Sequence, residues 1–156
     1  MPITTATPAP IAARVFGLTA AMAQAAALLA ARHLPQWEVI DYASATKPYV
    51  PSGTARELAE RLGEVRAPEL GHPIEDLHGP QEARGATVAG TQVHSVRLPS
   101  FVVSTEVVFG LPDERLTIRH DAGGSPEPYV AGTLIAARRA PVLVGLTRGL
   151  DTLLLG

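Results

Sequence analysis

Apolar side chains recur at helical spacing in three stretches of the chain. Residues 13–33 are dominated by Ala and Leu, which are strong helix formers. Residues 54–62 are amphipathic, because Leu58 and Leu62 lie on one face while charged side chains occupy the other. Residues 127–139 have a similar pattern. Three helices are therefore predicted at these places.

Apolar runs and alternating positions predict four strands, over residues 37–42, 91–98, 101–109 and 114–120. The third strand alternates most clearly, with one face made by Phe101, Val103, Thr105, Val107 and Phe109. Short connections join the last three strands at Pro99-Ser100 and Pro112-Asp113. These connections predict that the last three strands are antiparallel neighbours.

The order of these elements predicts the fold class. We expect an α+β domain with a mixed, mainly antiparallel sheet and helices packed on one face. Residues 13–156 are expected to form this single domain, and residues 1–12, which hold several Pro and Thr, to form a flexible arm. Residues 66–90 show no period and are expected to form a long surface loop.

Composition and charge exclude several classes of function. The formal net charge of the 156 residues is −2, without a basic stripe, so nucleic acid is not expected as a partner. The chain has no cysteine, which excludes disulfides and thiol catalysis and fits a cytoplasmic protein. The apolar run at residues 18–31 is shorter than the roughly 20 residues of a membrane span, and no cluster of positive charge precedes it. We expect neither a membrane anchor nor a signal peptide.

The segment from Lys47 to Ala55 carries the strongest chemical signal. Its sequence is Lys-Pro-Tyr-Val-Pro-Ser-Gly-Thr-Ala, a loop that opens a helix. Ser52 or Thr54 can cap this helix, and the free N–H groups at a helix start attract an anion. Lys47 adds a positive charge on the same loop. The segment suits the binding of a carboxylate, although a plain helix cap beside a solvent-exposed lysine has the same spacing.

This segment resembles Lys-x-Asp-x-Pro-Ser-Gly-Thr-Ala, the signature of dihydrodipicolinate reductases. The resemblance extends over roughly residues 16–155 and includes the run Arg97 to Phe109 and the closing run Gly145 to Asp151. It implies the carboxy-terminal, substrate-binding half of that family, in which the lysine and the Ser-Gly-Thr segment hold a dicarboxylate. A small-molecule substrate is therefore expected at this loop.

Eight residues are the candidates for this site. The catalytic candidates are Lys47, Tyr49 and Asp41. The substrate-binding candidates are Ser52, Gly53, Thr54, Tyr42 and Ser44. Asp41 and Tyr42 are included because they end the strand that leads into the loop with Lys47. No metal is expected, since His72 and His78 match no standard spacing of metal ligands.

Several positions depart from the pattern of the family. The family has two histidines, one of them its proposed acid, where this chain has Ala43 and Ser44. Neither of these side chains can protonate a substrate near neutral pH. Tyr49 stands where the signature has Asp, Val15 where the family has a hinge Asn, and Thr105 where it has a His. The pocket is therefore expected to be more apolar than that of the family.

The nucleotide-binding features of the family are also missing. Its redox half begins with a strand and a Gly-x-Gly-x-x-Gly turn, and no such run occurs in this sequence. Only twelve residues precede the predicted first helix, which leaves no room for a nucleotide-binding unit. We therefore expect no cofactor, and no binding of nicotinamide dinucleotides by this chain alone.

Three functions agree with these observations. The favoured one is a cofactor-independent enzyme for cyclisation, isomerisation or addition on a relatively apolar substrate, promoted by positioning within a shaped cavity. The second is a non-catalytic module for ligand binding or oligomerisation, or a partner of a separate nucleotide-binding chain. The third is a fragment of a dihydrodipicolinate reductase.

The predicted sheet also suggests self-association. Residues 91–120 place apolar side chains on the sheet, and the resemblance implies oligomers that pair their open sheet faces. The alternating apolar face from Phe101 to Phe109 fits such a contact. A homo-oligomer, either a dimer or a tetramer, is therefore expected. His94 and His120 lie on predicted strands with Glu106 between them in sequence. They could form an acid–base pair, or they could belong to a solvated sheet face.

Overall fold

The computed structural model describes residues 17–143, 147 and 149–155. The predicted arm at residues 1–12 and the start of the predicted first helix lie outside these residues. The described chain forms two compact units: Ala23–Gly124 form the larger one, and the described residues on either side of this range form the smaller one. The single domain expected over residues 13–156 stays a prediction.

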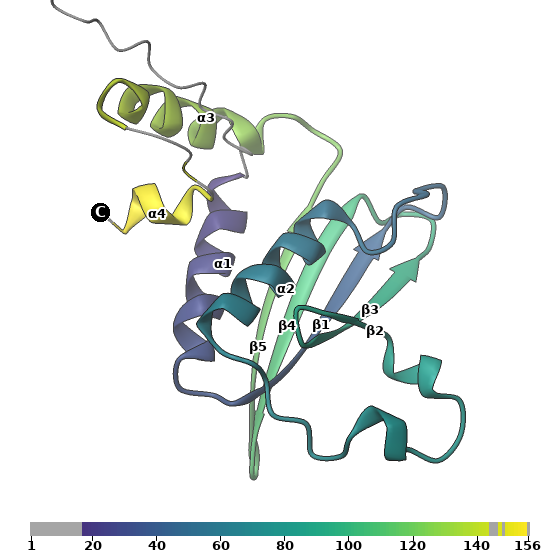
Figure 1. Cartoon of the computed structure of the whole chain (residues 1–156). Coiled ribbons are helices and arrows are strands. Elements are labelled where there is room, and N and C mark those ends of the chain that lie inside the picture. The colour runs from purple at the N-terminus through teal and green to yellow at the C-terminus, as the bar shows by residue number, and fades with distance from the viewer. Residues whose placement is uncertain (1–16, 144–146, 148, 156) are drawn as a thin grey trace, which may run out of the picture. The chain divides into compact units, whose positions relative to one another are not determined.

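A five-stranded sheet is the centre of the larger unit (Figure 1). Its strands are β1 (Gln36–Ala43), β2 (Ala86–Val88), β3 (Thr91–Arg97), β4 (Val103–Leu111) and β5 (Glu114–Ala122). They lie in the order β2-β3-β1-β4-β5, with β1 parallel to β3 and the other pairs antiparallel. The predicted α+β class, with a mixed and mainly antiparallel sheet, is confirmed.

The parallel pair follows from the helix between its strands. α2 (Gly53–Val65) lies between β1 and the β2–β3 hairpin in the chain. Parallel strands need such a crossover, because a tight turn can only return the chain antiparallel. β1 pairs with β3 along one edge and with β4 along the other, so it lies between these two strands. The prediction that β3 and β4 are neighbours is wrong for this reason, although the two strands do run in opposite directions.

The loop predicted at residues 66–90 contains regular structure. Two short 3-10 helices lie within it, η1 (Ile74–Asp76) and η2 (Gln81–Arg84), and β2 follows them. The turn between β2 and β3 is Ala89-Gly90, whose residues have positive φ angles of 47° and 84°. Alanine rarely adopts this conformation, and such turns usually contain Asn-Gly or Asp-Gly. The sequence therefore carried no clear signal for this hairpin.

Two helices lie over one face of the sheet (Figure 1). Apolar side chains between these helices and the sheet form the core. The helices are α2 and the second half of α1 (Leu18–Ala31), which contributes small alanines. Burial alternates along β1, and its helix-facing side chains are Trp37, Val39, Asp41 and Ala43. Trp37 packs on Phe109 with ring centroids 5.7 Å apart, and its Nε1 donates to Thr91 Oγ1 at 3.0 Å. This bond gives the N–H group, the only polar group of the buried indole, its hydrogen-bond partner.

The smaller unit is helical. It contains α3 (Pro128–Arg139), η3 (Ala140–Val142), α4 (Asp151–Leu154) and the start of α1. A Cβ atom at Gly17 would lie 3.2 Å from the Pro128 carbonyl oxygen, so a larger residue there would force its neighbour to move. Among the described residues, no helix has the length and apolar character needed to cross a membrane.

Leu62 offers a test of the core. Its side chain is fully buried on α2, so Leu62→Ala removes buried methyl groups and leaves a cavity. The free energy of unfolding is expected to fall by about 2–5 kcal/mol, as measured by urea unfolding followed by circular dichroism. Leu29→Ala is the matched control, because Leu29 lies on a helix, α1, and is 58% exposed. It should change stability by no more than about 0.5 kcal/mol. Equal losses in the two variants would contradict this description of the core.

Candidate functional site

The loop between β1 and α2 presents the start of a helix. Ser52 is the N-cap of α2, and its Oγ accepts a hydrogen bond from the Ala55 N–H at 3.3 Å. The Arg56 N–H donates to the Ser52 carbonyl oxygen at 2.9 Å. The N–H groups of Gly53 and Thr54 therefore have no acceptor within the helix, and they form the positive end of its dipole. A helix start of this kind suits a carboxylate.

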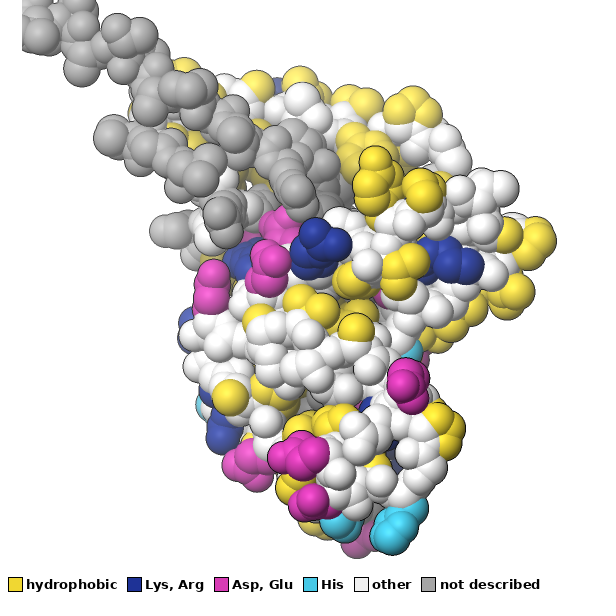
Figure 2. Space-filling view, turned by 45° about the vertical axis from the view of Figure 1, so that its right-hand side comes forward, with side chains coloured by type: hydrophobic (Ala, Val, Ile, Leu, Met, Phe, Trp, Pro, Cys, Tyr) yellow, Lys and Arg dark blue, Asp and Glu magenta, His cyan; other side chains and the backbone are white. Residues whose placement is uncertain are grey.

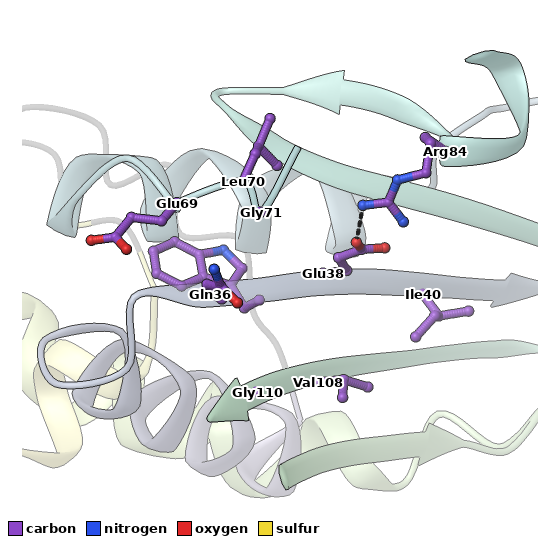
Figure 3. A pocket seen from close by; sticks show the side chains of 10 residues that line it. Gln36, Glu38, Ile40, Glu69, Leu70, Gly71, Arg84, Val108 and Gly110 are labelled. Carbon is purple, nitrogen blue, oxygen red and sulfur yellow. Dashed lines mark hydrogen bonds and ion pairs between the residues drawn. The ribbon is translucent and has the colours of Figure 1, made fainter. Parts of the chain in front are cut away.

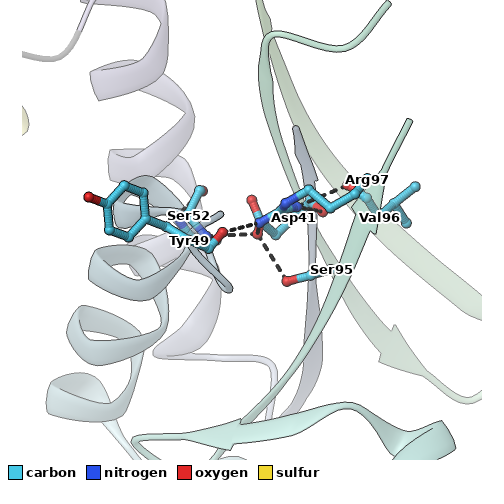
Figure 4. Close-up of polar contacts among 7 residues, drawn as sticks. Asp41, Tyr49, Ser52, Ser95, Val96 and Arg97 are labelled. Atoms are coloured by element: carbon cyan, nitrogen blue, oxygen red, sulfur yellow. Dashed lines mark hydrogen bonds and ion pairs between the residues drawn. The ribbon is translucent and has the colours of Figure 1, made fainter. Parts of the chain in front are cut away.

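A buried carboxylate holds this helix start to the sheet. Asp41 of β1 is fully buried, and its Oδ2 atom accepts hydrogen bonds from three sides (Figure 4). The donors are the Ser52 N–H at 2.8 Å, Ser95 Oγ at 3.0 Å and Arg97 Nη2 at 2.8 Å. One carboxylate oxygen thus joins the first turn of α2 to β3.

Arg97 extends this network from β3 to the loop between β1 and α2, residues 44–52, which is called the motif loop. Its Nη2 also donates to the Tyr49 carbonyl oxygen at 2.7 Å, and its Nη1 donates to the Val96 carbonyl oxygen at 2.9 Å. The Arg97 side chain is only 15% exposed, so its ion pair with Asp41 is largely shielded from water. Removing one partner of such a pair would leave the other charge buried and unpaired, which is costly.

The surroundings of Asp41 keep its carboxyl group ionised. Burial raises its pKa, but hydrogen bonds from Ser52, Arg97 and Ser95 together lower the pKa below the ordinary value of 3.8. The carboxylate is therefore negative near neutral pH and is balanced by Arg97. This arrangement suits an anchor better than a group that exchanges protons with a ligand.

Six of the predicted site residues lie on or beside this loop: Ser44, Lys47, Tyr49, Ser52, Gly53 and Thr54. Lys47 is half-buried, and its N–H donates to the Ser44 carbonyl oxygen at 3.0 Å, which turns the loop. The Tyr49 side chain is 70% exposed, and its ring points away from Asp41 (Figure 4). The loop thus combines a positive charge, free N–H groups and an exposed aromatic ring.

Tyr42 lies elsewhere. Successive side chains of a strand point to opposite faces, so Tyr42 lies on the face away from the helices, whereas Asp41 lies toward them. The Tyr42 ring packs on Phe101 with centroids 5.1 Å apart, and the Arg119 guanidinium lies 4.6 Å from its centroid. The structure therefore brings Asp41, but not Tyr42, to the motif loop.

Three polar side-chain atoms in this region are buried without a hydrogen-bond partner in the described part of the chain: Asp41 Oδ1, Arg97 Nε and Thr105 Oγ1. Asp41 and Thr105 are paired across β1 and β4, and His120 of β5 pairs with Thr105. Burial lowers the pKa of His120 below 6.5, against the opposing effect of Asp121. The two oxygens among them, Asp41 Oδ1 and Thr105 Oγ1, are suited to a water molecule or a polar group of a ligand.

A hollow lies on the face of the sheet that points away from the helices of the core. It has a volume of about 360 Å³ and lies between β1, β4 and the segment 69–71 (Figure 3). Ile40, Val108 and Leu70 supply apolar walls. Glu38 lies at its edge, where it forms an ion pair with Arg84. The hollow thus has an apolar floor with charged groups at its border.

The histidines do not form the pairs that the sequence left open. His72 and His78 are exposed on the loop with η1 and η2, and Figure 2 shows histidine and acidic side chains gathered in the lower part of that view. In the described ranges, no three potential metal ligands lie together. His94 of β3 and His120 of β5 lie on opposite faces, with β1 and β4 between their strands, so they form no acid–base pair.

Sequence reasoning does not identify Ser95 or Arg97 as part of the site. Ser95 lies 54 positions from Asp41, and Arg97 lies 48 positions from Tyr49. The parallel register of β1 and β3 places Asp41 beside Ser95 and Ala43 beside Arg97. The signal that could have revealed this is the succession of strand, helix and strand, which predicts a parallel pair.

Asp41→Asn tests the buried anchor. The variant leaves Arg97 without its counter-ion, so the free energy of unfolding near neutral pH is expected to fall by about 3–5 kcal/mol. Because the folded-state pKa of Asp41 is depressed, its stabilisation is present above the ordinary pKa of 3.8 and is lost as the pH falls through the folded-state pKa. The gap between parent and variant should shrink below about pH 4.

Urea unfolding across this pH range measures the gap. Asp113→Asn is the matched control, because Asp113 is exposed in the β4–β5 turn and Asn tolerates its positive φ of 64°. A gap between parent and Asp41→Asn that stays constant into acid would contradict the assigned role of the ionised carboxylate.

Known proteins resemble this chain over most of its length. A family profile described as "Dihydrodipicolinate reductase, C-terminus" matches residues 15–153. The 4-hydroxy-tetrahydrodipicolinate reductase of Desulfitobacterium hafniense (strain DSM 10664 / DCB-2) is 43% identical over 80% of this chain and 46% of the relative. That of Mycolicibacterium gilvum (strain PYR-GCK) is 39% identical over 89% of this chain and 56% of the relative.

A solved structure is also similar. It is described as a dipicolinate-bound dihydrodipicolinate reductase from Paenisporosarcina sp. TG-14. The match has a TM-score of 0.78 and 31% sequence identity, and it covers 90% of this chain and 52% of that chain. The chain thus spans about half the length of the relatives that it matches.

These similarities correct the favoured expectation of function. The relatives are named as reductases, so a cofactor-independent cyclase, isomerase or lyase is the wrong interpretation. The alternative, that the chain is part of a dihydrodipicolinate reductase, agrees with them. The error has a physical reason: apolar replacements such as Ala43 change the lining of a pocket, but they do not by themselves change a reaction class. Because the profile matches residues 15–153, this chain belongs to the dihydrodipicolinate reductase family and corresponds to its C-terminus.

Proposed function

We propose that this chain supplies the substrate-binding part of a 4-hydroxy-tetrahydrodipicolinate reductase and binds a dicarboxylate at the start of α2. The observation that carries the proposal is the pair of N–H groups of Gly53 and Thr54, which lack an acceptor within the helix, on the same loop as Lys47. The names of the relatives and the dipicolinate of the solved structure support the choice of ligand.

Dipicolinate matches the chemistry of the loop. It carries a carboxylate at each side of an aromatic ring. One carboxylate can accept hydrogen bonds from the N–H groups of Gly53 and Thr54, while Lys47 supplies a positive charge for a carboxylate. The exposed ring of Tyr49 offers an apolar surface beside them. The loop would thus bind and orient a flat dicarboxylate.

A nicotinamide dinucleotide does not fit the residues present. Its site requires a glycine-rich turn between a strand and a helix, and the sequence has no Gly-x-Gly-x-x-Gly run. Ala43 and Ser44, where the resemblance places the proposed acid of the family, also lack a group that donates protons near neutral pH. The proposal therefore gives this chain ligand binding and orientation, and it assigns none of these residues to the nucleotide.

Calorimetric titration with dipicolinate tests the proposal. The unmodified chain is expected to bind, and Lys47→Ala should weaken affinity by on the order of tenfold to a hundredfold, because losing a charged donor costs about 1.5–3 kcal/mol. Gly53→Pro removes one of the two N–H groups at a helix position that tolerates proline, and it should also weaken binding. Arg115→Ala removes a charge at the far end of β5 and should leave affinity unchanged.

Chemical modification gives an independent readout. Lys47 is the only lysine in the sequence, so acetylation of a lysine side chain reports on this position alone. Dipicolinate is expected to slow acetylation of Lys47, as measured by peptide mass mapping. If the unmodified chain binds no dipicolinate at millimolar concentration, or if Lys47→Ala and Gly53→Pro bind it as tightly as the parent, the proposal fails.

We also propose that the sheet face away from the helices pairs with a second copy of the chain. This face presents Ile40 and Val108 at the hollow, and two ion pairs lie on it, Arg84–Glu38 and Arg119–Glu106. The opposite face of β4, which holds Val107 and Phe109, is buried in the core, so the contact expected from the sequence on that face is wrong. A sheet with apolar side chains on both faces needs a cover on each. Within the larger unit, α2 and the second half of α1 cover only one face of the sheet.

Sedimentation at micromolar concentration tests this pairing. The unmodified chain is expected to be a dimer or larger, and Val108→Lys should dissociate it, because the substitution places an unpaired charge in the contact. Glu60→Lys is the control, since Glu60 is exposed on α2. A monomer mass for the unmodified chain would refute the pairing.

A further inference from the structure

We propose that Arg97 is a positioning residue for the dicarboxylate site. Its guanidinium fastens the motif loop, residues 44–52, to β3 and thereby fixes the direction of the free N–H groups of Gly53 and Thr54. The inference rests on the proposed function and adds a residue that the motif does not contain. Arg97 would touch no ligand, and it would act through the loop that does.

The motif loop has little else to hold it. Its side chains at positions 45, 46 and 48–50 are exposed. Apart from its bonds to Asp41 and Arg97 and the cap of α2, its hydrogen bonds in the described part of the chain are local. Examples are the bond from the Lys47 N–H to the Ser44 carbonyl oxygen and the bond between the hydroxyl groups of Ser44 and Thr46. Fixing the backbone of one residue costs about 1–2 kcal/mol in conformational entropy. A loop with this exposure therefore needs bonds from outside to keep one conformation.

Those bonds come from Arg97 and Asp41. The Arg97 Nη2 atom donates both to the Asp41 carboxylate at 2.8 Å and to the Tyr49 carbonyl oxygen at 2.7 Å (Figure 4). Its Nη1 atom donates to the Val96 carbonyl oxygen at 2.9 Å, which fixes the guanidinium plane against β3. The loop is thus held in its middle by Arg97 and at its end by the bond from Ser52 N–H to Asp41 at 2.8 Å.

The two attachments depend on each other. Arg97 and Ser52 share one acceptor, Asp41 Oδ2, so a displaced guanidinium also disturbs the bond that holds the helix start. Asp41 must stay ionised to accept these donors, and the same donors lower its pKa. Without Arg97, the N–H groups of Gly53 and Thr54 would sample many directions, and a ligand would bear the entropy cost of ordering them.

Lysine cannot replace arginine in this role. A guanidinium presents several N–H donors in one rigid plane, whereas an ammonium group is a point charge on a flexible chain. Arg97→Lys keeps the positive charge next to Asp41. The lysine should not be able to donate hydrogen bonds to the Asp41 carboxylate, the Tyr49 carbonyl and the Val96 carbonyl at the same time. This variant therefore separates charge balance from the geometry of the loop.

The experiment combines dipicolinate affinity with hydrogen exchange. Arg97→Lys and Arg97→Ala are both expected to weaken dipicolinate binding by on the order of tenfold. Amide exchange should accelerate in the peptide covering residues 44–56, while the β4–β5 hairpin stays protected. Arg66→Ala is the matched control, because it removes an arginine from an ion pair with Glu69 at the surface, and it should change neither readout.

Chemical rescue distinguishes positioning from plain stability. Millimolar guanidinium, which is too dilute to unfold a protein, should restore part of the dipicolinate affinity of Arg97→Ala but none of that of Lys47→Ala. If Arg97→Ala folds and keeps both the affinity and the slow exchange of residues 44–56, the inference is overturned. If the unmodified chain binds no dipicolinate, the proposed function fails, and the exchange of the Arg97 variants still decides whether this residue fastens the loop.

Discussion

The ion pair between Asp41 and Arg97 connects three parts of the fold that are distant in sequence: β1, the start of α2 and β3. Asp41 is fully buried in a central strand, where an unpaired charge would be prohibitive. Its carboxylate is therefore tolerated only because donors from Ser52, Ser95 and Arg97 surround it. The same requirement dictates where the loop and the helix start must lie. The need to pair the buried charge of Asp41 thus constrains the geometry of the candidate site.

The order of the strands makes this arrangement possible. β1 lies between β3 and β4, so that both of its edges are hydrogen-bonded and its helix-facing side chains are covered by α1 and α2. The alternation along the strand then divides the chemistry of the sheet between its two faces. Asp41 and Thr105 lie on the helix-facing side near the motif loop, while Glu38 and Tyr42 lie on the other side. The candidate ligand site and the candidate contact between copies therefore use different faces of one sheet.

Most of the elements and the motif loop could be predicted from the sequence, because their signals are local. Helical spacing, strand alternation and the Ser-Gly-Thr helix start each depend on a few neighbouring residues. The β2–β3 hairpin was not predicted, because its turn depends on a positive φ at Ala89, which alanine rarely adopts. The role of Arg97 was not predicted either, because its acceptors on Asp41 and Tyr49 belong to a segment about fifty positions earlier.

The sequence by itself determined the fold class, the positions of the main helices and strands, and the loop in which Lys47 stands before Ser52. Its resemblance to the dihydrodipicolinate reductases already named the family that the profile match later showed. Only the tertiary structure decided which strands are neighbours, that Tyr42 turns away from the loop, and that Arg97 reaches it. The physical reason is that backbone propensities act over a few residues. The pairing of a buried charge, in contrast, is settled by whichever segments the sheet register brings within hydrogen-bond distance.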